Sequence, residues 1–129
     1  MFKKLSVIIA LLMVFTLLAG CAGGATTKGD KLKVFGAFAT PIEEPWDGVI
    51  HEALQKAEDA GSIEYTYTED IGYSGDMERV LREVAEQQKP DLIVGDAFVN
   101  EEAVRRVAAD YPEIAFAFGS ELGPVAPNM

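Results

Sequence analysis

From residue 31 onward, the hydrophobic and polar positions of the chain alternate between two periodicities. Short runs of apolar, β-branched or aromatic residues predict strands, and segments with apolar residues every three or four positions predict amphipathic helices. The predicted strands are residues 32–38, 63–68, 91–95 and 114–118.

Three helices are predicted between these strands, each with start or stop signals. The first helix ends at Gly61, the second is capped near Ser74 and ends before Pro90, and the third is capped by Asn100 and ends at Pro112. The apolar positions of the first helix, which predict its buried face, are Trp46, Val49, Ile50, Ala53, Leu54 and Ala57.

An alternation of strands and helices is typical of an α/β fold with a parallel sheet and helices on both faces. In such sheets, ligands bind beyond the carboxyl ends of the strands, near the point where the strand order reverses. The segments that follow the predicted strands are therefore the candidate binding loops. They are residues 39–46, 69–75, 96–99 and 119–123.

The first 20 residues have the pattern of a secretory signal peptide, with Lys3 and Lys4 before an apolar run at residues 5–18. That run is shorter than the roughly 20 residues that a membrane-spanning helix needs. It ends in LAGC, which resembles the lipobox of bacterial lipoproteins and predicts lipidation of Cys21, the only cysteine. Residues 21–30 are small and polar, as expected for the lipidated cysteine and a flexible linker.

Charge and missing motifs exclude several classes of function. The formal net charge of -10 argues against binding to nucleic acid and against electrostatic docking on anionic lipids. The sequence contains neither a Walker-type phosphate loop nor a Gly-rich dinucleotide motif after the first strand. His51 is the single histidine, so the sequence predicts no metal site, no cofactor and no enzymatic activity. Glu43 and Glu44 are interpreted as charges that favour the start of a helix.

Aromatic residues follow three of the predicted strands: Trp46 after the first, Tyr73 after the second and Phe98 after the third. Flat rings are good partners for a nucleobase or another planar ligand. Asp96 and Ser120 are polar neighbours at the strand ends. This arrangement favours a small-molecule site over a set of unrelated core residues.

Several motifs together resemble the BMP family (basic membrane protein, PnrA-like) of ABC-transporter substrate-binding lipoproteins. They are the lipobox, KVFGAF, a P-x-x-x-P-W helix start, GYSGDMERVLREVAEQQKPDLIVGDAF and AADYPEIAFAFGS. The resemblance implies a type I periplasmic-binding-protein fold, in which two flavodoxin-like α/β lobes close on a ligand and deliver it to a membrane permease. It also implies a purine nucleoside or a related planar solute as the ligand.

Carried over residue by residue, the resemblance makes Trp46 the base-stacking ring and Phe98 a second wall. Asp96 and Ser120 would be polar contacts, and Thr40 and Asp47 would flank the first loop. The family's loop before the first helix is often rich in Asp, Asn or Gln, whereas this chain has IEEPW there.

Residues 31–129 correspond to the N-terminal lobe alone, so the second lobe is expected to be absent. The expected partners are a nucleoside-like ligand, the permease subunits and the membrane through the lipid anchor. The expected location is the extracytoplasmic side of the cell membrane, on the outer face of the plasma membrane or in the periplasm. A surface lipoprotein with a sensing role and a flavodoxin-like cofactor-binding enzyme are the alternatives.

Overall fold

The computed structural model describes residues 31–119, 123 and 126–129. The predicted signal peptide and linker, with Cys21, lie outside the described residues, as does Ser120. Strands and helices alternate as predicted. The elements are β1 (Leu32–Ala37), α2 (Pro45–Asp59), β2 (Ile63–Thr68), α3 (Asp76–Gln87), β3 (Leu92–Asp96), α4 (Glu101–Asp110) and β4 (Ala115–Gly119).

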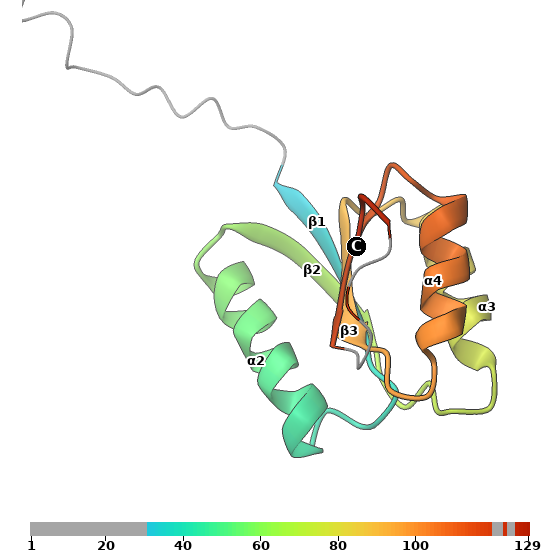
Figure 1. The fold of residues 1–129 in the computed structure, drawn as a ribbon. Coiled ribbons are helices and arrows are strands. Elements are labelled where there is room, and N and C mark those ends of the chain that lie inside the picture. Colours follow the sequence, from blue (N-terminus) through green and yellow to red (C-terminus); the bar gives the residue numbers. More distant parts are fainter. Residues whose placement is uncertain (1–30, 120–122, 124–125) are drawn as a thin grey trace, which may run out of the picture.

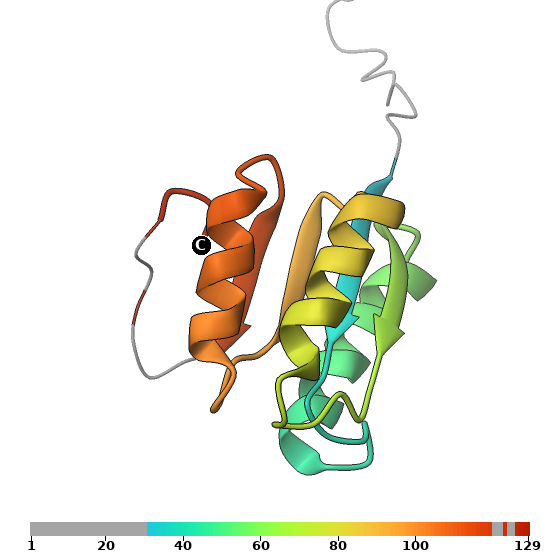
Figure 2. The ribbon, with the colours of Figure 1, turned by 90° about the vertical axis from the view of Figure 1, so that its right-hand side faces the viewer.

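The four strands form one parallel sheet in the order β2-β1-β3-β4. Helix α2 lies on one face of this sheet, and α3 and α4 lie side by side on the other (Figures 1 and 2). This arrangement confirms the prediction of a parallel sheet with helices on both faces. It also brings the carboxyl ends of all four strands to the same edge of the sheet.

The main hydrophobic core lies between the sheet and the two helices α3 and α4. Phe35, Ile93 and Phe116 are aligned across β1, β3 and β4, and all three are buried. Leu81 of α3 and Val104 of α4 are fully buried in the same core. Burying a side chain of this size stabilises the fold by about 1.5 to 3 kcal/mol, so this face holds the lobe together.

The prediction for the buried face of α2 is wrong at several positions. Trp46 and Val49 are 67% and 69% exposed, Ala53 is also exposed, and the buried residue of this helix is Asp47. The physical reason is that α2 is the only described helix on its side of the sheet. Strand residues that alternate with the buried Phe116, such as Ala117, are exposed on that side as well.

The predicted helix caps differ from the observed ones in detail. Helix α3 begins after Gly75, which adopts a left-handed conformation with φ of 101°. The predicted cap Ser74 instead donates a long hydrogen bond of 3.4 Å to the Asp76 carboxylate. Asn100 does precede α4, but it makes no side-chain cap bond. Its amide donates to the Gly72 carbonyl at 3.1 Å, because the side chain is buried between two loops.

An ion-pair network joins α3 to α4 on the surface. Glu78 accepts hydrogen bonds from Arg106 at 2.8 Å and from Arg82 at 3.0 Å, and Arg82 also reaches Asp110 at 2.9 Å. The hydrogen bonds from Arg106 and then from Arg82 lower the pKa of Glu78 below its ordinary value of 4.5. The carboxylate therefore stabilises the folded chain above that ordinary pKa, and the effect is lost as the pH falls through the lowered pKa.

Replacing Glu78 with glutamine should lower the melting temperature slightly at pH 7 in low salt. The reason is that both arginine side chains lose a charged acceptor, although at this partly exposed surface site the effect is small and screened by salt. Thermal melts of both proteins at pH 7 and pH 3 check this expectation. A difference that is as large at pH 3 as at pH 7 would contradict a role for the ionised carboxylate.

Candidate ligand-binding site

The sheet order determines where a binding crevice can form. From β1 the chain continues to β2 on one side, whereas β3 pairs with β1 on the other side, so the strand order reverses between β1 and β3. In open α/β sheets, ligands bind beyond the carboxyl ends of the strands at such a reversal. The segments that follow β1 and β3 carry Trp46 and the residues from Asp96 to Val99.

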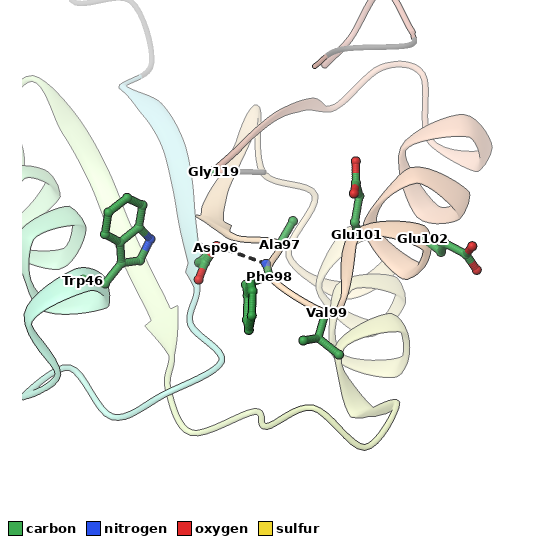
Figure 3. Close-up of a pocket in the computed structure, with 8 residues that line it drawn as sticks. All are labelled: Trp46, Asp96, Ala97, Phe98, Val99, Glu101, Glu102 and Gly119. Atoms are coloured by element: carbon green, nitrogen blue, oxygen red, sulfur yellow. Dashed lines mark hydrogen bonds between the residues drawn. The ribbon is translucent and has the colours of Figure 1, made fainter. Parts of the chain in front are cut away.

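A cavity lies at this position, and its volume of about 790 Å³ is within the usual range for small-molecule sites. Trp46 extends from the first turn of α2 towards the segment after β3, across from Asp96 and Phe98 (Figure 3). The structure thus brings together three of the predicted site residues. The lining residues are Trp46, Asp96, Ala97, Phe98, Val99, Glu101, Glu102 and Gly119.

The start of α2 positions the indole ring. Pro45 is the first helical residue, where its fixed φ and missing N–H are favourable, so Trp46 belongs to the first turn. A Cβ on Gly48 would lie 2.5 Å from the Ile42 carbonyl oxygen, so only glycine lets the preceding loop fold this closely over the helix. The Trp46 ring lies close to the end of β4, since a Cβ on Gly119 would be 3.8 Å from it.

Thr40 and Asp47 face each other and do not line the cavity. The Asp47 carboxylate is 1% exposed and accepts hydrogen bonds from the Thr40 N–H at 3.0 Å and the Thr40 hydroxyl at 2.7 Å. These bonds tie the loop after β1 to the helix turn that carries Trp46. Glu43 and Glu44 are exposed and lie outside the cavity lining, as expected for helix-start charges.

Further hydrogen bonds join the loops around the site, and sequence analysis did not anticipate them. Glu69 accepts from the Ile42 N–H at 2.8 Å, and the Gly72 N–H donates to the Ala39 carbonyl at 2.9 Å. The Asn100 amide then connects Gly72 to the start of α4. The loops after β1, β2 and β3 therefore support one another. Glu69 directly follows the predicted strand at residues 63–68, and this position at a strand end was the signal available for it.

A compact turn presents Phe98 to the cavity. Asp96 accepts the Phe98 N–H at 3.0 Å with one carboxylate oxygen, and the Asn100 N–H donates to the Ala97 carbonyl at 2.8 Å. Phe98 remains 55% exposed, and Tyr73 packs edge-on against it with ring centroids 6.3 Å apart. Tyr73, the third predicted ring, thus supports Phe98 without lining the cavity itself.

The carboxylates of the cavity differ in their surroundings. Glu101 pairs with Arg105, and Glu102 lies 3.6 Å from Arg106 with its side chain pointing into solvent. Among the residues that the structure describes, Asp96 makes no ion pair, and its second oxygen makes no hydrogen bond. Asp96 is therefore the carboxylate best placed to accept a hydrogen bond from a ligand next to the two rings.

Other candidate chemistry lies elsewhere or is not found. His51 is a half-buried residue of α2 whose Nδ1 lies 3.0 Å from the hydroxyl of Tyr65 on β2. Burial raises the pKa of that tyrosine. Within residues 31–119 and the described C-terminal positions, no His, Cys, Asp and Glu side chains cluster as metal ligands. The same part of the chain has no helix with the length and apolar character to cross a membrane.

These features define one α/β lobe of the periplasmic-binding-protein type. The fold is similar to that of an ABC transporter solute-binding protein from Conexibacter woesei, with a TM-score of 0.60 and 22% sequence identity. The similarity covers 70% of this chain and 30% of that protein.

Sequence comparison identifies the family. The Bmp family, described as PnrA-like ABC transporter substrate-binding proteins, matches residues 34–122, and the chain belongs to it. The chain is also 30% identical over 127 residues to an uncharacterized lipoprotein of Pyrococcus furiosus. The aligned region covers 96% of this chain and 31% of the relative. The chain thus spans about a third of the length of both proteins.

Proposed function

We propose that this chain forms the first lobe of a solute-binding lipoprotein of an ABC importer, which captures a purine nucleoside or a related planar solute. The observation that carries the proposal is the position of Trp46. Its large aromatic ring is 67% exposed, and it faces Asp96 and Phe98 across a cavity at the strand-order reversal. Membership of a substrate-binding family supports the same role.

Each residue has a distinct part in the proposed site. Trp46 stacks on the flat face of the solute, and Phe98 forms a second wall. Asp96 accepts a hydrogen bond from a sugar hydroxyl or an exocyclic amine with its available oxygen. Ser120 follows Gly119 at the end of β4 and is proposed as a further polar contact. Thr40 and Asp47 act indirectly, by holding the turn that carries Trp46.

A single lobe covers one side of a bound solute. We place the opposite wall of the cleft in the part of the family's length that this chain does not span. Binding to the 129-residue chain should accordingly be weak, because less of the ligand is desolvated while the entropy cost of association remains. In this proposal, the solute is delivered to a permease by the complete two-lobed protein.

The role requires attachment to the outer side of the membrane, and we propose that Cys21 supplies it. In this proposal, residues 1–20 are the signal peptide, residues 21–30 are the lipidated cysteine and linker, and residues 31–129 are the lobe. Acyl chains bind the protein to the membrane without a spanning helix.

Replacing Cys21 with alanine should move the protein from the membrane fraction to the soluble fraction when it is expressed in a bacterium, because the sulfur that carries the lipid is lost. Fractionation and mass spectrometry of the N-terminus check this result. Replacing Ser6 with alanine, within the predicted signal peptide, is the matched control and should leave the distribution unchanged. An alanine variant that stays in the membrane fraction would contradict lipid anchoring through Cys21.

Calorimetry with a small panel of solutes tests the proposed ligand class. Adenosine and guanosine should bind, whereas a hexose and an amino acid without a planar ring should give no heat. Binding of the hexose or the amino acid in place of the nucleosides would overturn the nucleoside assignment and leave the solute-binding role in place. Absence of binding by every solute would overturn the proposal for this chain.

A further inference from the structure

The backbone at Val99 is strained, although the residue lies on the surface. Among the described residues, three that are not glycine have a positive φ: Asp70, Lys89 and Val99, at 54°, 49° and 63°. This left-handed region is unfavourable for any side chain with a Cβ and most unfavourable for a β-branched one. Each case therefore needs a compensating reason.

Local structure explains the other two residues. Lys89 follows the end of α3, and its N–H donates to the Val84 carbonyl at 3.1 Å, which is the usual left-handed ending of a helix. Asp70 is of a type that tolerates the left-handed region, and its N–H donates to the Thr40 carbonyl at 3.1 Å. Val99 has neither advantage, because it is β-branched and follows no helix.

The strain at Val99 is maintained by its neighbours on both sides. The hydrogen bond from the Asn100 N–H to the Ala97 carbonyl closes the turn around Phe98 and Val99, and the buried Asn100 side chain is fixed on Gly72. This turn leaves Val99 67% exposed on the cavity wall beside Phe98 (Figure 3). A valine that is this exposed gains little packing energy in the unliganded lobe to offset the strain.

We propose that Val99 is a specificity-determining contact of the ligand site, which packs its two methyl groups against the apolar edge of a planar solute. This inference rests on the proposed function and adds a residue to the site. The strained backbone holds the methyl groups at the cavity wall, where bound solute buries them. Glycine or asparagine would relieve the strain and remove the apolar contact, so stability and affinity should change in opposite directions.

The test compares Val99→Gly and Val99→Asn with the unchanged 129-residue chain, with adenosine as the probe. Both substitutions should raise the melting temperature by about 2 to 6 °C, because the strain is lost. Both should weaken adenosine binding by about 3- to 10-fold, because the buried methyl groups are lost. Lys89→Gly is the matched control. It relieves a positive φ far from the cavity, so it should raise the melting temperature and leave adenosine affinity unchanged.

The possible outcomes separate this inference from the proposed function. If adenosine binds and both Val99 variants bind it as tightly as the unchanged chain, the contact role of Val99 is overturned and the site itself stands. If the variants lose affinity but melt at lower temperature, the claim that strain holds the contact is overturned. If the unchanged chain binds no adenosine, the proposed ligand class is overturned together with this inference.

Discussion

Replacing Trp46 with alanine should weaken the binding of adenosine by about 1 to 3 kcal/mol, which is the usual contribution of one stacked base. The indole ring is the largest exposed aromatic surface on the cavity wall, and its loss leaves Phe98 as the remaining ring there. Because Trp46 is 67% exposed, the same substitution should hardly change the free energy of unfolding. Calorimetric titration and a denaturant melt of the same sample measure both quantities.

Val49→Ala is the matched control for this experiment. Val49 lies one turn further along α2, is 69% exposed and does not line the cavity, so its truncation should leave adenosine affinity unchanged. Trp46→Phe should have an intermediate effect, because a smaller ring is retained. Equal affinities of the alanine variant and the unchanged chain would remove Trp46 from the site.

Replacing Asp47 with alanine should lower the free energy of unfolding by about 2 to 3 kcal/mol, because the Thr40 N–H and hydroxyl lose a charged acceptor in a buried place. The loop after β1 should then loosen around the helix turn that carries Trp46. Adenosine binding should weaken as a consequence, even though Asp47 lies outside the cavity lining. Urea denaturation with a parallel titration measures both effects.

Two further variants separate the bonds of this contact. Thr40→Val removes only the hydroxyl bond and should cost about 1 kcal/mol. In the double variant with Asp47→Ala, the two losses should be less than additive, because both variants remove the same hydrogen bond. Strictly additive losses would show that Thr40 and Asp47 act independently and would contradict their role as one positioning unit.

The sequence predicted the fold well, because strand and helix periodicities are local signals. The parallel sheet, the seven elements and the position of Trp46 and Phe98 at strand ends follow from hydrophobic spacing and from the geometry of α/β sheets. The order of the strands did not follow from the spacing. Because β1 and β3 are neighbours in the observed order, the loops that follow them meet at the cavity. Strand β2 lies at the edge of the sheet, and Tyr73, which follows it, only packs against Phe98.

The remaining differences arise from contacts between segments distant in the sequence. Hydrophobic spacing assigned Trp46 and Val49 to a buried face of α2, but burial depends on what covers a helix, and spacing carries no such information. Asn100 has the sequence signature of a helix cap, yet its partner is Gly72, 28 residues away. The left-handed backbone conformation of Val99 also depends on tertiary contacts, because valine by itself disfavours a positive φ.

The proposed function requires that a planar solute bind between Trp46 and the segment from Asp96 to Val99. Titration of the isotopically labelled 129-residue chain with adenosine, followed by ¹H–¹⁵N NMR, tests this claim most directly. We predict progressive shifts of the Trp46 indole signal and of the amides of Phe98 and Val99, with little change at Lys89, which follows the C-terminal end of α3 and does not line the cavity. Absence of shifts, or shifts that leave Trp46 and Phe98 unaffected, would contradict the account.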